Sequence, residues 1–183
     1  MKYIVLDLEA TCWQERGKSP NEIIEIGALC FNQNKEKMGE FSRFVKPVVH
    51  QQLSAFCTEL TSITQADVND APMFPNVIAD FQNWLSSFED DYLLCSWGFY
   101  DKNQFEADCK LHGLKTDWVE NHISLKHQYS QICNVRSVGM KGAILREGMK
   151  LDGTHHRGID DARNIAKIFI KYFEQWDFSH RRA

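Results

Sequence analysis

The chain has 183 residues, of which 43% are hydrophobic and 25% are charged, and it carries a formal net charge of −4 with a pI near 6.0. This length and apolar content predict a single domain over residues 1–183, with its core at about 2–176. Apolar runs stay shorter than about 18 residues and charge appears by Asp7, which excludes a membrane span and a signal peptide, so we expect a cytoplasmic protein with no membrane partner.

The first predicted element is a short apolar strand from Tyr3 to Leu8, with two carboxylates at its far end. Side chains at positions i and i+2 of a strand share a face, so Asp7 and Glu9 project together. Two like charges repel each other there, and a bound Mg²⁺ or Mn²⁺ would supply the counter-charge. The same pattern is also typical of a strand end that faces solvent, so a metal site needs support from the rest of the chain.

Strands and helices alternate along the middle of the chain. Two strands separated by a polar turn predict an antiparallel meander with the first strand. The predicted elements are strands at Glu22 to Phe31, Met38 to Val45 and Tyr92 to Trp97, a helix that starts at the capping box Thr64 to Asp67, and a helix across Phe74 to Leu85.

The second half continues the alternation and ends in an amphipathic helix. The predicted elements are helices near Asp101 to His112, Lys126 to Cys133, Lys141 to Gly148 and Ile159 to Trp176, and a short strand near Ile123 to Leu125. This order indicates an α/β fold with a mixed five-stranded sheet and helices on both faces. We expect the loop from Cys12 to Asn21 to be the most mobile segment.

The last predicted helix separates two adjacent aspartates. Steps of three or four residues from Asp161 reach Ile165 and Phe169 on the inward stripe. The same steps from Asp160 reach Asn164 and the lysines beyond it, on the stripe that faces water. A carboxylate on a buried stripe is costly unless it is paired or binds a metal, so Asp161 is a candidate ligand and Asp160 a surface or capping residue.

A histidine pair precedes this helix in a glycine-bearing loop. An imidazole there could take a proton from a metal-bound water near neutral pH, and His156 stands five residues before Asp161. The residues alone do not separate His155 from His156. The remaining histidines fit surface positions: His50, His112, His122, His127 and His180.

Basic residues are unevenly distributed along the chain. Residues 1–100 hold 7 Lys and Arg against 14 Asp and Glu, while residues 101–183 hold 14 against 11. The basic residues near the last motif, Lys141, Arg146, Lys150 and Arg157, could follow a phosphate backbone or could be scattered solvated side chains. This weak positive charge suits contact with a few terminal nucleotides.

The candidate residues together resemble the three motifs of the DEDDh 3′-to-5′ exonucleases. These are Asp7-x-Glu9 on a first strand, Asp101 after a strand that ends Ser96-Trp97-Gly98, and His156-x-x-x-x-Asp161 opening a last helix. The spacing in that family selects His156 over His155. One departure is the insert Gly98-Phe99-Tyr100 before Asp101, which is longer than in eukaryotic relatives.

Within that family, the sequence of these segments most resembles the histone-mRNA 3′-exonuclease and enhanced-RNA-interference branch, including its small bacterial relatives. The similar segments are LDLEATCW, NEIIEIGA, LSAFCTELTSITQADV and HHRGIDDARNIAKI, and the resemblance runs from Lys2 to about Phe173. It implies a ribonuclease H-like fold. It also implies an enzyme that hydrolyses single-stranded RNA or DNA, with RNA preferred, from the 3′ end and releases nucleoside 5′-monophosphates.

The resemblance assigns a role to each motif residue. Asp7 would bridge two divalent cations, Mg²⁺ or Mn²⁺, and Glu9 and Asp161 would complete the shell of the ion that carries the attacking water. Asp101 would hold the second ion through water, and His156 would deprotonate the attacking water.

The same analogy predicts the residues that bind the 3′ end of the substrate. Glu9, His156 and the main chain near Ala10 and Thr11 would surround the terminal sugar. Phe56 would stack on the last base, with Tyr100 as a second candidate, although each aromatic alone could equally belong to the core. The chain leaves no room for an appended nucleic-acid-binding domain, so we expect a separate protein partner for targeting.

Two other function classes fit the same residues. One is an inactive module that holds RNA ends or a protein, and the other is a metal-dependent endonuclease or phosphatase. All five motif positions are intact, which favours an active exonuclease because unneeded clustered carboxylates destabilise a fold. Six irregularly spaced cysteines predict reduced thiols, several of them in the core, and no disulfide framework.

Overall fold

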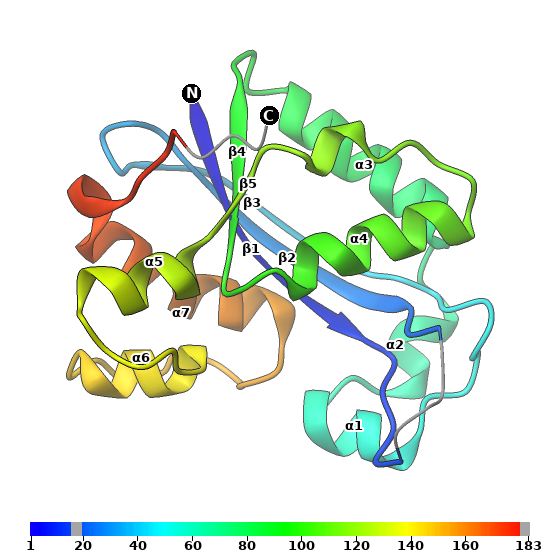
Figure 1. Ribbon diagram of the computed structural model, residues 1–183. Helices are drawn as coiled ribbons and strands as arrows, with labels where there is room; N and C mark the ends of the chain where they lie inside the picture. The colour runs from blue at the N-terminus through cyan, green and yellow to red at the C-terminus, as the bar shows by residue number, and fades with distance from the viewer. Residues whose placement is uncertain (16–19, 180–183) are drawn as a thin grey trace.

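One mixed sheet organises the molecule (Figure 1). The structure is a computed structural model that describes residues 1–15 and 20–179. The strands lie in the order β3-β2-β1-β4-β5, so β1 is central. Their bounds are Lys2–Ala10 for β1, Ile23–Phe31 for β2, Lys37–Phe44 for β3, Tyr92–Ser96 for β4 and His122–Ser124 for β5.

Helices cover both faces of this sheet. The α-helices are α1 Ala55–Thr61, α2 Gln65–Asn69, α3 Phe74–Ser86, α4 Tyr100–Leu111, α5 Leu125–Ile132, α6 Met140–Arg146 and α7 Gly158–Lys171, and two short 3₁₀ helices are η1 Asp117–Val119 and η2 Phe173–Gln175. The predicted mixed five-stranded α/β sheet is confirmed. Within the described residues, no helix is both long and apolar enough to cross a bilayer.

Successive side chains of β1 pack alternately into two separate hydrophobic cores. Tyr3 and Val5 pack into the cluster formed with α5, α6 and α7, while Ile4 and Leu6 pack into the cluster formed with α3 and α4. Figure 1 shows these two groups of helices on opposite sides of the strands. A strand that is apolar on both faces must lie inside a sheet, which is why β1 is central.

The pairing of the strands brings distant parts of the sequence together at one end of β1. β1 pairs antiparallel with β2, with Asp7 opposite Gly27, and parallel with β4, with Val5 opposite Cys95. β4 then pairs parallel with β5. The carboxyl ends of the three parallel strands therefore meet at the same edge, where the acidic residues lie.

The last helix is shorter than predicted. α7 ends at Lys171 and η2 follows, whereas the apolar pattern predicted a helix as far as Trp176. The indole Nε1 of Trp176 donates a hydrogen bond of 2.8 Å to the Phe169 carbonyl, so this side chain folds back over the helix end. Its burial produced the apolar signal without further helical turns.

Two polar residues predicted at the surface are buried. Asn164 is fully buried because its amide donates to the Asp152 carbonyl at 2.8 Å and accepts from the Asp152 amide at 3.0 Å. His122 lies on β5 with 8% of its surface exposed. The two bonds of Asn164 offset the cost of its burial, whereas His122 pairs its Nε2 with the Ser96 hydroxyl at 2.8 Å and leaves its buried Nδ1 without a partner among the described residues.

The predicted loop from Cys12 to Asn21 is only partly described, because residues 16–19 lie outside the described residues. All six cysteines are free thiols, as predicted, and four of them are buried.

Candidate active site

Three carboxylates from two elements converge at the end of β1. Asp7 and Glu9 project from one face of the strand, and Asp161 comes from the first turn of α7. One oxygen from each lies within 4.8 Å of the others, which is close enough to bind a common cation. Glu9 and Asp161 are buried, whereas Asp7 is only half-buried. The structure thus unites residues that are more than 150 positions apart in the sequence.

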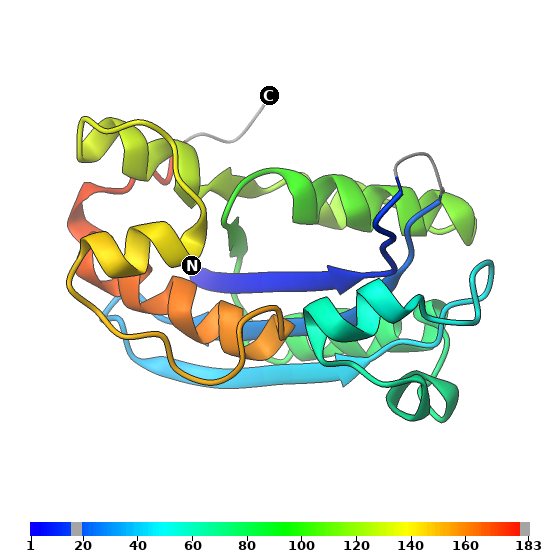
Figure 2. The ribbon, with the colours of Figure 1, turned by 90° about the horizontal axis from the view of Figure 1, so that it is seen from below.

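The start of α7 is held against β2 by a buried acid. The Glu25 carboxylate is 1% exposed and accepts hydrogen bonds from the Gly158 amide at 2.9 Å and the Arg157 Nε at 3.1 Å. An anion at a helix N-terminus also interacts favourably with the helix dipole. Figure 2 shows the start of α7 and helix α1 beside the end of β1.

Gly27 makes this close approach possible. A Cβ atom at Gly27 would lie 2.2 Å from the Ile159 amide nitrogen. A residue with any side chain at this position would push α7 away from the sheet. Because Gly27 pairs with Asp7, it sets the distance between the β1 carboxylates and Asp161.

Asp101 reaches the same region from the first turn of α4. It is 4% exposed, and its Oδ1 accepts a hydrogen bond of 3.1 Å from the Leu8 amide, between the two carboxylates of β1. The Ser96 hydroxyl also bonds to its carboxylate. These interactions with Leu8 and Ser96 fix the orientation of the Asp101 side chain toward β1.

The acidic cluster strongly favours bound positive charge. Burial, followed by the charges of Asp101, Glu9 and Asp161, raises the pKa of Asp7 well above its usual range. Burial and the neighbouring acids raise the pKa of Glu9 to about 8, and burial raises that of Asp101 to about 6. Hard oxygen ligands with raised pKa values fit a divalent cation such as Mg²⁺ or Mn²⁺, which would supply the missing counter-charge.

Both histidines of the loop before α7 approach Asp161. The Asp161 Oδ2 accepts a hydrogen bond of 3.0 Å from the His156 amide and lies 3.0 Å from the His155 Nδ1. The two imidazoles stack with their centroids 3.9 Å apart, and His156 takes a left-handed backbone with φ of 65°. Burial lowers the pKa of His156, which keeps this ring neutral and able to accept a proton. Its role as the base stays a prediction.

Two exposed aromatic side chains flank the acidic cluster. Tyr100, at the start of α4, is 54% exposed, and Phe56, on α1, is 37% exposed. Burial of the phenol, followed by the charges of Asp101 and Glu9, raises the pKa of Tyr100. Their exposure leaves both rings accessible, and their stacking on the last base stays a prediction.

The other predicted substrate residues hold the end of β1 in place. The Thr11 amide donates to the Glu22 carbonyl at 2.8 Å, and the Thr11 hydroxyl accepts from the Glu22 amide at 2.9 Å. These bonds occupy the Thr11 amide, and the binding of the 3′ end by main-chain groups near Ala10 and Thr11 stays a prediction. The Ala10 carbonyl accepts a weak hydrogen bond of 3.8 Å from the Cys57 thiol.

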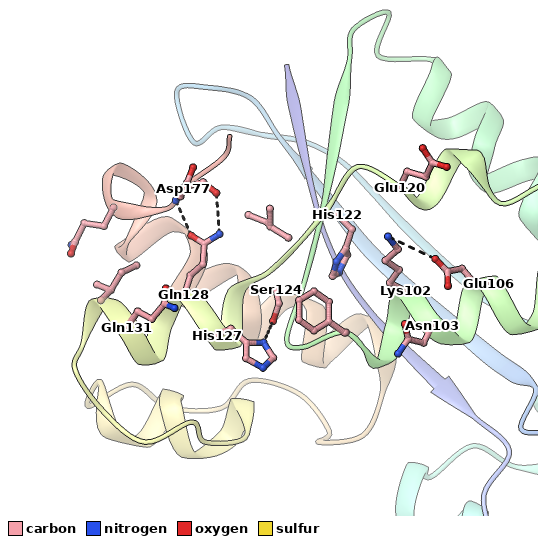
Figure 3. A pocket seen from close by; sticks show the side chains of 14 residues that line it. Lys102, Asn103, Glu106, Glu120, His122, Ser124, His127, Gln128, Gln131 and Asp177 are labelled. Atoms are coloured by element: carbon pink, nitrogen blue, oxygen red, sulfur yellow. Dashed lines mark hydrogen bonds and ion pairs between the residues drawn. The ribbon is translucent and has the colours of Figure 1, made fainter. Parts of the chain in front are cut away.

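A cavity of about 550 Å³ lies between α4 and α5, along the β5 edge of the sheet (Figure 3). Its lining includes Phe99, Lys102, His122 and His127, and none of the candidate metal ligands. The His122 Nε2 lies 2.8 Å from the Ser96 hydroxyl, which links this wall of the cavity to Asp101. The cavity therefore lies behind the acidic cluster and not over it.

Comparisons with known proteins agree with this geometry. A family model described as "Exonuclease" matches residues 4–169. The nuclease domain of 3′hExo, described as a DEDDh family member bound to rAMP, has a TM-score of 0.88 and 31% identity, over 94% of this chain and 92% of that one. The chain belongs to the DEDDh exonuclease family.

Curated relatives agree with the DEDDh assignment. ERI1 exoribonuclease 2 of Danio rerio is 34% identical over 186 residues, covering 90% of this chain and 34% of that protein. The 3′-5′ exoribonuclease 1 of Homo sapiens is 33% identical over 182 residues, covering 93% of this chain and 52% of that protein. The chain thus spans between a third and about half of the length of these relatives.

More distant structures share only the DEDDh fold. Exonuclease X in complex with 5′ overhanging duplex DNA has a TM-score of 0.67 at 17% identity. The ribonuclease H-like fold expected from the resemblance is confirmed by these neighbours.

Sequence reasoning missed two residues that support the DEDDh site. Glu25 anchors α7, and Ser96 holds Asp101. Glu25 lies two positions before Gly27 in an otherwise apolar strand, and a charged residue there was the available signal. No local pattern distinguishes Ser96 from an ordinary strand residue.

Proposed function

We propose that this protein is a two-metal-dependent 3′-to-5′ exonuclease that hydrolyses single-stranded nucleic acid, with RNA preferred, and releases nucleoside 5′-monophosphates. The observation that carries this proposal is the convergence of Asp7, Glu9 and Asp161 within 4.8 Å, with Asp101 anchored beside them. Membership of the DEDDh family supports the same reaction.

Each candidate residue would have its own role in this reaction. Asp7, Glu9, Asp161 and Asp101 would hold two divalent cations, Mg²⁺ or Mn²⁺, which when bound stabilise the attacking and leaving oxygens of the phosphodiester. His156 would accept a proton from the attacking water, because its ring is kept neutral by burial. Phe56 and Tyr100 would position the terminal nucleotide by stacking, which contributes on the order of 1–3 kcal/mol per base.

Similar proteins support RNA as the substrate. The curated relatives are named exoribonucleases, and a structure with a TM-score of 0.88 and 30% identity shows 3′-end specific recognition of histone mRNA stem-loop by 3′-exonuclease. We also propose that a separate protein partner selects its natural RNA. The expected cytoplasmic location remains part of this proposal.

The decisive experiment follows the direction of degradation. The protein is incubated with 5′-labelled single-stranded RNA or DNA of equal sequence, with Mg²⁺, Mn²⁺ or a chelator. We expect a metal-dependent ladder that shortens from the 3′ end, faster for RNA, and its loss in Asp7→Asn. Asp80→Asn, an exposed aspartate on α3, is the matched control and should retain full activity.

The products separate the competing functions. Internal fragments would indicate an endonuclease, and free phosphate a phosphatase. Intact substrate that stays bound to the protein would indicate a binding module and not an enzyme.

A further inference from the structure

Two cysteine thiols meet beside the acidic cluster. Cys12 lies just beyond β1, three residues after Glu9, and Cys57 lies in the first turn of α1, next to Phe56. Each thiol is the largest single influence on the pKa of the other. Cys57 is fully buried and its thiol points toward the Ala10 carbonyl, whereas Cys12 is half-buried.

Ser54 holds both cysteine backbones in place. Its hydroxyl caps α1 by accepting a hydrogen bond of 2.9 Å from the Cys57 amide, and it donates one of 2.6 Å to the Cys12 carbonyl. Both cysteines also pack into one small apolar cluster with Ile24 and Ile63. The fold therefore holds the two cysteines side by side through their backbones.

The other four cysteines have different surroundings. Cys30 and Cys109 pack in the α3 and α4 core, and Cys95 and Cys133 pack in or against the α5 to α7 core. Cys133 is half-buried, like Cys12, but its thiol bonds to the Tyr172 hydroxyl. It is a natural control for general thiol oxidation.

We propose that Cys12 and Cys57 form a redox modification site, which hydrogen peroxide converts into a disulfide that weakens substrate binding at the neighbouring site. In the first step a thiolate attacks the peroxide, an S–O bond forms, the O–O bond breaks and hydroxide leaves, giving a sulfenic acid. The second thiol then attacks this sulfur, the S–S bond forms and water leaves. Overall, two thiols and one peroxide give one disulfide and two waters.

The chemistry of the pair supports this step. The interaction with Cys12 lowers the pKa of Cys57 to about 7 and raises that of Cys12, so Cys57 is the thiol that ionises first. A dithiol reductant would reverse the reaction by thiol–disulfide exchange.

The consequence for the site follows from bond length. A disulfide requires about 2.05 Å between sulfurs, less than the contact distance of two thiols, so oxidation would draw the segment after β1 and the start of α1 together. That movement would shift Phe56 relative to Glu9. This step rests on the proposed function, since it places the 3′ nucleotide between these two residues.

The test uses the full chain, treated with hydrogen peroxide and then analysed without reductant by peptide mass mapping and by RNA cleavage kinetics. We expect a linked Cys12–Cys57 peptide, a KM for single-stranded RNA raised several-fold, and recovery of both after dithiothreitol. Cys12→Ser should lose the linked peptide and the change in KM, while Cys133→Ser should keep both.

Each of the other outcomes contradicts one part of the proposal. Absence of the linked peptide removes the modification site. A linked peptide with unchanged kinetics removes its coupling to the site, and equal inhibition of Cys12→Ser assigns the effect to another residue. If the reduced protein has no nuclease activity, the proposed function fails, while the mapping still decides whether the thiol pair is oxidised.

Discussion

At the scale of single residues, the loop histidines carry the sharpest functional question. His155 and His156 stack on each other, and both approach the same aspartate, but through different atoms. His155 meets Asp161 through its ring, whereas His156 meets it through its backbone amide, which leaves the His156 ring for another task. This arrangement agrees with a base at His156 and a supporting role for His155.

We expect His156→Ala to lower kcat for RNA cleavage by about 10²- to 10⁴-fold, the usual contribution of a positioned general base. Metal affinity and oligonucleotide binding should change little, because the backbone amide that bonds to Asp161 remains. Single-turnover kinetics and calorimetric Mg²⁺ titration measure the two effects. His155→Ala is the comparison, and undiminished turnover in His156→Ala would remove its assigned role.

At the scale of elements, the docking of α7 on the sheet determines the geometry of the site. The helix supplies Asp161, while Glu25 and Gly27 on β2 fix where it begins. The site therefore depends on residues that never contact a metal or substrate.

Replacing Gly27 tests this dependence. We expect Gly27→Ala to lower the free energy of unfolding by about 1–3 kcal/mol, because the new methyl group overlaps the α7 backbone. Turnover should fall more than the small change in folded fraction explains, because Asp161 moves. Urea unfolding and cleavage assays measure both.

Gly142→Ala on α6 is the matched control. Its new Cβ would lie 3.5 Å from the Val138 Cβ, an ordinary contact, and a helical glycine replaced by alanine usually gains about 0.5–1 kcal/mol. Equal turnover in the two variants would show that the position of α7 is not critical.

The sequence predicted elements well where periodicity was strong, and individual contacts poorly. The inward position of Asp161 followed from helical spacing, and the capping box at Thr64 is present. Helix α1 was missed, although Ser54 caps it, because its seven residues are too short for a clear period. Asn164 could not be placed, since its partner Asp152 lies 12 residues away in a loop.

At the scale of the whole molecule, the acidic cluster links metal binding to global stability. The pKa of Glu9 is raised from 4.5 to about 8 in the folded protein. Between these values the folded protein retains a proton that the unfolded chain has released, so rising pH favours unfolding. A cation that replaces this proton should remove the effect.

We therefore expect the Tm of the chelator-treated protein to fall as pH rises from about 5 to 8. Saturating Mg²⁺ should raise the Tm most at the high end of this range. Thermal unfolding at several pH values measures both trends. Glu9→Gln cannot titrate at this position and should show a shallower slope with chelator, so equal slopes in the two proteins would contradict this linkage.

The order in which the ligands occur along the chain has a consequence during synthesis. Asp7 and Glu9 belong to the first strand, Asp101 follows β4, and Asp161 belongs to α7, which also covers β1 and β2. A nascent chain on the ribosome therefore carries an incomplete ligand set until α7 has emerged. The proposed nuclease activity would therefore be absent from the growing chain until α7 has been synthesised, and the messenger would be protected from it up to that point.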